Sequence, residues 1–136
     1  MAAPVQEVLS ELKRLGNDAT KRTWLRHGAQ EPVFGVRIGD MKVLLKRIKK
    51  DHDLAIDLFD TGVADAMYFA AFLVDDAKMS KRDLQRWAKQ AKWQMISDYT
   101  VAWCAAESRF GWELALEWID SKHQHVACAG WSTLSN

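Results

Sequence analysis

Apolar residues recur every three or four positions along most of this chain, which predicts helices, and no segment shows the alternation typical of strands. The first stripe predicts a helix over residues 4–15 and consists of Val5, Val8, Leu9, Leu12 and Leu15. Residues 16–18 end this helix, and Asp18 is expected to cap a second one that extends to about His27. Four loop-forming residues then predict a connecting loop: Gly28, Pro32, Gly35 and Gly39.

The same spacing predicts short helices along the rest of the chain, at about residues 40–50, 53–60, 63–74, 80–91, 94–105, 110–121 and 123–134. Segment 63–74 is apolar on almost every side, which is typical of a helix packed between neighbours. Short helices joined by tight turns pack as antiparallel pairs, and stacked pairs build a solenoid of the HEAT type. We therefore predict an all-α, HEAT-like α-solenoid that forms a single domain over residues 1–136.

The last predicted helix, "ACAGWSTLSN", is apolar and has no polar helix after it, although a solenoid end normally requires one. We expect either that the chain is the N-terminal part of a longer protein or that another chain covers this end. Self-association through the uncapped end is one form of the second alternative.

Composition places the chain among ordinary globular domains, with 49% hydrophobic and 27% charged residues. No apolar run approaches the roughly 20 residues that span a bilayer, and the first residues lack a secretory pattern. Cys104 and Cys128 form no CxxC pair, and two such cysteines fit a reducing compartment. We expect a cytoplasmic protein that does not enter membranes.

The formal charge of +1 hides an asymmetry along the sequence. Residues 1–50 carry 11 Lys/Arg and five Asp/Glu, whereas residues 51–136 carry eight and 13. Two groups of bases stand out, one of them Lys42, Lys46 and Lys50 at helical spacing. The other group, within residues 78–92, contains a single acid, Asp83, and six bases: Lys78, Lys81, Arg82, Arg86, Lys89 and Lys92. If both groups line one hollow, they form a surface that follows nucleic-acid phosphates; the alternative is solvated helix faces.

Other chemistries find little support in the sequence. His123, His125 and Cys128 lack the second ligand pair of a zinc site, so no metal is predicted. Neither cysteine has a histidine in a recognisable nucleophile motif, and no phosphate-binding glycine loop follows a strand. A helical Arg109–Glu113 ion pair is the structural explanation for Arg109. Six large residues are expected in the core: Met67, Tyr68, Phe69, Phe72, Trp112 and Trp118.

Three segments resemble one known family. "FGVRIGDMKVLLKRI" is similar to the opening of the AlkD-like DNA alkylation repair family, and "LAIDLFDTGVADAMYFAAFLVDD" is similar to its next helical pair. "DLQRWAKQAKWQMISD" resembles the following segment, where a tryptophan opens a helix. The resemblance covers residues 32–136 and implies HEAT-like repeats that hold duplex DNA on a basic concave face. Active members hydrolyse the N-glycosidic bond of cationic alkylated purines without a metal or a nucleotide cofactor.

Such a reaction needs a carboxylate near the sugar, because departure of the charged base leaves an oxocarbenium-like centre. In the family that carboxylate lies one helical turn after the opening tryptophan, which matches Trp93, so its place falls on Ser97. Asp98 is the adjacent acid, and a shift of helix register or a π-bulge would be needed to bring it to that face. The family's phosphate-binding arginines match Ala127 and Cys128, so the resemblance is broken at two places.

We accordingly predict a DNA-binding protein, with hydrolysis by Trp93 and Asp98 as a hypothesis. The predicted DNA-binding residues are Lys42, Lys46, Lys50, Lys81, Arg82, Arg86, Lys89, Lys92 and Arg109. The alternative is a non-catalytic HEAT-like scaffold that holds a protein partner. Salt dependence separates the two, because phosphate contacts weaken steeply with salt and an apolar interface does not.

Overall fold

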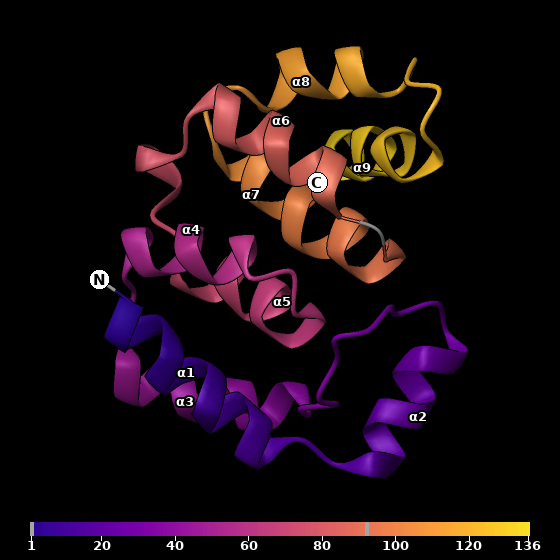
Figure 1. The fold of residues 1–136 in the computed structure, drawn as a ribbon. Helices are drawn as coiled ribbons and strands as arrows, with labels where there is room; N and C mark the ends of the chain where they lie inside the picture. Colours follow the sequence, from indigo (N-terminus) through magenta and orange to yellow (C-terminus); the bar gives the residue numbers. More distant parts are fainter. Residues whose placement is uncertain (1, 92) are drawn as a thin grey trace. The chain divides into compact units, whose positions relative to one another are not determined.

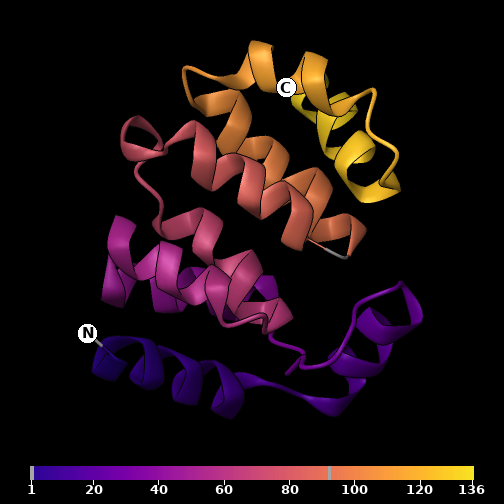
Figure 2. The same ribbon diagram turned by 45° about the horizontal axis from the view of Figure 1, so that its top comes forward.

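The structure, a computed structural model, describes residues 2–91 and 93–136, and all of their regular secondary structure is helical (Figures 1 and 2). This confirms the all-α prediction. The α-helices are α1 (Ala2–Leu15), α2 (Asp18–Arg26), α3 (Ile38–Ile48), α4 (His52–Asp60), α5 (Ala64–Leu73), α6 (Lys81–Gln90), α7 (Ala102–Glu107), α8 (Gly111–Trp118) and α9 (Gln124–Ser135). A 3₁₀-helix, η1 (Asp76–Lys78), and a π-helix, η2 (Ile96–Val101), complete the list.

The chain forms two compact units, Met1–Val74 and Asp75–Asn136. None of the helices in the described part of the chain is long and apolar enough to cross a membrane. Whether the two units make up one domain, as the sequence predicts, stays a prediction.

In the first unit, α4 and α5 form an antiparallel pair. A short turn at Gly62, where φ is +75°, connects them, and the Asp51 N–H donates to the Leu73 carbonyl over 3.0 Å. Helices α1 and α3 pack against this pair (Figure 1). The apolar stripes predicted from the sequence supply the core, with fully buried side chains that include Leu12, Met41, Leu58, Phe59 and Phe69.

Several helix ends differ from the sequence prediction, among them the start of α2, the start of α4 and the end of α3. Asn17 caps α2 by accepting from the Thr20 N–H over 2.9 Å, so the prediction of Asp18 as the cap is wrong. Helix α4 begins at His52 because Asp51 caps it, one residue before the expected start. Helix α3 ends at Ile48, two residues early, and the next residue turns the chain with a φ of +68°.

Asp65, at the start of α5, holds the loop that leads into α3. Its fully buried carboxylate accepts from the N–H groups of Phe34, Gly35 and Val36 over 2.5, 3.0 and 2.8 Å. Burial raises the pKa of this carboxyl, and the backbone N–H donors act in the opposite direction. Gly35 has a φ of +80°, and a Cβ there would lie 2.4 Å from the Lys21 nitrogen, so this place in the loop requires glycine.

In the second unit, α8 and α9 form the other close helix pair. Gly130 permits the close approach, because a Cβ at this position would lie 2.7 Å from the Ile119 nitrogen. Helix α6 is joined to α8 by two polar contacts, the Lys81–Glu113 ion pair and the hydrogen bond that Gln85 donates to Glu117 over 3.2 Å. The buried side chains of this unit include Leu84, Trp87, Ile96 and Leu114.

Candidate nucleic-acid-binding site

Each of the two units is nearly neutral, although the first 50 residues of the sequence are basic and the rest are acidic. Residues 1–74 carry 11 Lys/Arg and ten Asp/Glu, and residues 75–136 carry eight of each. Any attraction for a polyanion must therefore come from the placement of particular side chains, because neither unit has a strong overall field.

On α3, the predicted basic face is shorter than expected. Lys42 and Lys46 are exposed and lie one helical turn apart. Lys50 is also exposed, but it follows the end of the helix and does not continue their row, so the prediction of a three-lysine helix face is wrong.

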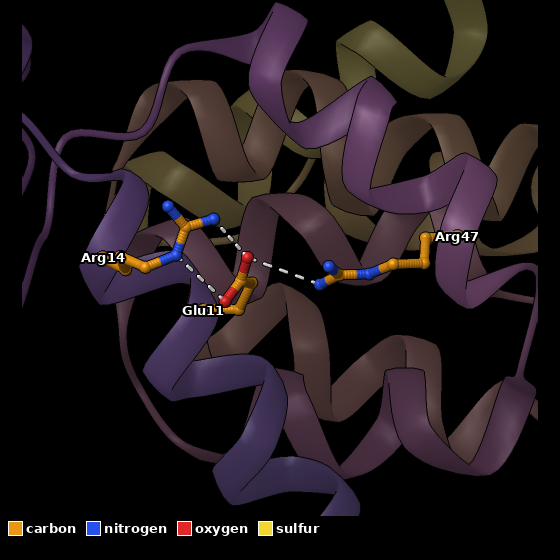
Figure 3. A network of polar contacts seen from close by, with 3 residues as sticks. All are labelled: Glu11, Arg14 and Arg47. Atoms are coloured by element: carbon orange, nitrogen blue, oxygen red, sulfur yellow. Dashed lines mark hydrogen bonds and ion pairs between the residues drawn. The ribbon is translucent and has the colours of Figure 1, made fainter.

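A cluster of paired charges in the first unit was not predicted. Arg14 of α1 and Arg47 of α3 meet at Glu11, which accepts from Arg14 Nε over 3.2 Å and lies 3.4 Å from Arg47 Nη2 (Figure 3). The guanidinium of Arg14 lowers the pKa of Glu11, and Glu11 raises the pKa of Arg14. A hollow of about 150 Å³ lies beside them and is also lined by Asp40. Two acids and two bases leave this cluster without a net charge, so we assign it to holding α1 against α3.

Helix α6 carries four of the nine predicted DNA-binding residues. Arg82 and Lys89 are exposed, and Arg86 is half-buried with its Nη2 3.4 Å from Asp83. Lys81 is held by Glu113 of α8, whose hydrogen bond raises the pKa of the ammonium group. Lys92 lies outside the described residues. Arg82 and Lys89 are thus the exposed cations on this helix.

Arg109 is exposed in the turn between α7 and α8, and its guanidinium lies 5.0 Å from the centre of the Phe110 ring. Within the described residues it forms no ion pair with Glu113, because that carboxylate binds Lys81. The predicted Arg109–Glu113 pair is therefore wrong. Cation–π contact with Phe110 orients the Arg109 side chain without neutralising its charge.

The residues matched to the catalytic motif lie mostly in the core. The Trp93 side chain is 4% exposed, and its carbonyl accepts from the Ile96 and Ser97 N–H groups. Ser97 is fully buried and its hydroxyl donates to the Ala91 carbonyl over 3.3 Å. Ser97 thus closes the turn between α6 and η2, and the role of Trp93 beside a sugar stays a prediction.

Asp98 lies in the π-helix η2, where the backbone widens beyond an ordinary α-helix. Its side chain is partly exposed, and Oδ2 accepts from Gln94 Nε2 over 3.1 Å. Oδ1 is shielded from solvent and has no hydrogen-bond partner among the described residues. A shielded carboxylate oxygen without a donor is costly to keep, and such groups often serve a function.

Helix α9 contains no Lys, Arg, Asp or Glu, and the matched residues Ala127 and Cys128 are half-buried on it. No cation on this helix therefore replaces the family's phosphate-binding arginines. Trp131 is 60% exposed on the same helix, and self-association through this end stays a prediction. His125 Nε2 lies 3.2 Å from the Lys89 carbonyl, and no group of three or more metal-ligating side chains occurs in the parts of the chain that the structure covers.

Exposed aromatic side chains are the feature that the sequence prediction missed. Trp112, expected in the core, is 74% exposed on α8, so that prediction is wrong. Tyr99 of η2 and Trp103 of α7 are 56% and 50% exposed. The sequence signal for Tyr99 and Trp103 is their spacing of four residues, which places both on the same side of a helix.

Comparison with known proteins defines the class of this protein. The model of the family described as "DNA alkylation repair enzyme" matches residues 8–136, and the chain belongs to this family. Its fold is HEAT-like, because a solved structure superposes with a TM-score of 0.89 at 43% sequence identity over 95% of this chain. That structure is described as a new family of proteins related to the HEAT-like repeat DNA glycosylases with affinity for branched DNA structures.

A curated relative is an uncharacterized protein, Lin0241, of Listeria innocua serovar 6a. It is 26% identical over 132 residues, which is 93% of this chain. The chain spans little more than half of both proteins, 58% of the Listeria protein and 55% of the solved chain.

Proposed function

We propose that this protein binds DNA, including branched DNA, through exposed cationic side chains. The observation that carries the proposal is the solved relative at 43% identity, whose family has affinity for branched DNA structures. Membership in a DNA alkylation repair family gives independent support.

The cations that suit this role are those whose charge no neighbouring acid neutralises. Among the predicted DNA-binding residues, Arg82, Lys89 and Arg109 meet this criterion in the second unit, and Lys42, Lys46 and Lys50 meet it in the first. All six are exposed, and no ion pair engages them among the described residues. Each is long enough to follow a phosphate while its stem stays on the helix surface. Lys81 contributes less, because binding a phosphate would require it to leave Glu113.

Titration of labelled DNA at several salt concentrations tests the proposal. The dissociation constant should rise steeply with salt, since each phosphate contact adds about 0.9 to the slope of log affinity against log salt. The double variant Arg82→Ala, Lys89→Ala should reduce that slope by about 1.8.

The matched control is Lys122→Ala, which removes one exposed charge from the turn before α9, outside the predicted set. It should leave the slope nearly unchanged. Absence of binding to both duplex and branched DNA at low salt would end the proposal. Equal losses for the control and for single Arg82 or Lys89 variants would show that only net charge matters.

Hydrolysis of the N-glycosidic bond of a cationic alkylated purine is the second candidate. The observation that favours it is Asp98 Oδ1, a carboxylate oxygen that no donor among the described residues engages. Because this oxygen is shielded from solvent, it would have to become accessible to face a developing positive charge. Ser97 cannot serve in this way, because it is neutral, buried and bonded to a backbone carbonyl.

Single-turnover excision from an oligonucleotide with one alkylated purine tests this candidate. Asp98→Asn should lower the rate while DNA affinity is kept, and Asp98→Glu should retain part of the rate. No detectable excision by the unaltered protein would remove hydrolysis and leave the DNA-binding proposal intact.

A further inference from the structure

Tyr99 and Trp103 are exposed aromatic residues on one side of the η2–α7 segment. They lie one helical turn apart, and the residues between and around them, Val101, Ala102 and Cys104, are buried. About half of each aromatic side chain faces solvent. Large aromatic side chains are usually mostly buried, so two on one turn call for an explanation.

Charged residues flank the aromatic pair in the sequence. Asp98 precedes the aromatic pair, Glu107 follows it at the end of α7, and Arg109 comes two residues later. The two acids disfavour phosphate groups beside the rings. Arg109, held over Phe110, is the cation at this end of the segment.

We propose that Tyr99 and Trp103 form a stacking surface for an unpaired nucleobase at a DNA branch, with Arg109 holding an adjacent phosphate. This inference rests on the proposed DNA-binding function and adds the feature by which a branch is distinguished from a duplex. In a continuous duplex every base is stacked on its neighbours, whereas bases at a branch or in a flap have a free face. An exposed aromatic ring binds such a face regardless of base identity.

The surface has the chemistry that this ligand needs. Stacking on a base requires an accessible aromatic ring but no hydrogen bonds to the edges of the base. Two exposed rings one helical turn apart meet this requirement. Arg109 follows Trp103 by six residues, at most roughly 20 Å of chain, so one strand can contact both. The guanidinium group suits a phosphate because its planar donors match the phosphate oxygens.

The test compares three labelled probes by fluorescence anisotropy: a linear duplex, a fork with two single-stranded arms, and a three-way junction with two unpaired thymines. The unaltered protein should bind the fork and the junction more tightly than the duplex. Trp103→Ala should weaken binding to the branched probes by roughly 5- to 150-fold, the range that loss of one stacked base produces. Tyr99→Ala should act in the same direction, and duplex binding should change by less than about twofold.

Two controls separate stacking from other effects. Trp103→Phe keeps a ring and should retain most of the branched-DNA preference. Trp112→Ala removes a still more exposed tryptophan from α8 and should leave the preference unchanged. The ratio of affinities between the unaltered protein and Trp103→Ala should not vary with salt, because stacking releases no counterions.

Failure of this inference differs from failure of the proposed function. If no probe binds, both are wrong. If all probes bind and Trp103→Ala and Tyr99→Ala keep the branched preference, DNA binding stands and the stacking surface is wrong. If these variants instead change the oligomeric state in analytical ultracentrifugation, the rings face a second copy of the chain and the inference is also overturned.

Discussion

Replacing Asp65 should destabilise the first unit strongly, because this carboxylate is the partner of three backbone N–H groups in the loop before α3. The bonds to Gly35 and Val36 are buried with it. A hydrogen bond to a charged group contributes about 1.5–3 kcal/mol, and each buried donor left unsatisfied costs about 1–3 kcal/mol. Since these terms overlap, we expect Asp65→Ala to lower the free energy of unfolding by roughly 3–5 kcal/mol.

Asp65→Asn is the sharper variant, because it keeps the shape and one acceptor oxygen but turns an NH₂ group toward a backbone donor. Its cost should be roughly half that of the alanine variant. Hydrogen exchange measured by mass spectrometry should show faster exchange of the amides at residues 34–36 in both variants. Asp57→Asn, the same change at an exposed place on α4, should leave that exchange unaltered.

The pH dependence gives a second readout of Asp65. Burial raises its pKa in the folded state, so between the ordinary carboxyl value of about 3.9 and that raised value the folded chain binds more protons than the unfolded one. The contribution of Asp65 to stability therefore falls as pH rises through this window. Asp65→Asn removes the contribution, so the stability difference between the two proteins should shrink with rising pH. Parallel urea midpoints from pH 4 to 7, together with unchanged exchange at residues 34–36, would refute the reasoning.

Three further changes test other contacts. Gly130→Ala should cost about 1–3 kcal/mol in thermal unfolding because the added methyl group meets the α8 backbone, whereas Gly39→Ala, with open space around it, should cost nothing. Ser97→Asp restores the family's carboxylate but buries it beside a carbonyl, so it should destabilise by several kcal/mol and give no gain in excision. Lys81→Ala and Glu113→Ala should have small, non-additive effects on stability that disappear in 1 M salt; fully additive effects would contradict the ion pair.

Local patterns predicted the helices well, because the apolar spacing that defines each of them is set within a dozen residues. The sequence predicts a helix from Ser80, and in the structure the Ser80 hydroxyl caps α6 by accepting from the Asp83 N–H. The sequence analysis considers a π-bulge near Asp98 but does not predict one. The hydrogen-bond pattern of a π-helix depends on packing on both sides of the segment, which the local sequence does not reveal.

Contacts between distant residues account for what the sequence missed. Glu113 binds Lys81, 32 residues away, in place of the near neighbour Arg109, and nothing in the local spacing distinguishes the two cations. Asp65 is visible in the sequence as a lone carboxylate near the start of an apolar helix. The N–H groups that it accepts from lie about 30 residues earlier, so its partners could not be predicted. For the candidate site, the sequence names the charged residues, whereas their exposure and their pairing with acids depend on the fold.

The π-helix η2, residues 96–101, determines how the side chains after it are rotated around the helix axis relative to those before it. Trp93 before this π-helix and Ile96 at its first position are buried, and Ala102, Cys104 and Ala105 after it are buried as well. Deleting one residue within the π-helix would give an ordinary helix and rotate everything after it by about 100°. Either Trp103 would then be forced inward or the small residues would be expelled, so homologues that lack this extra residue should carry a different aromatic pattern on α7.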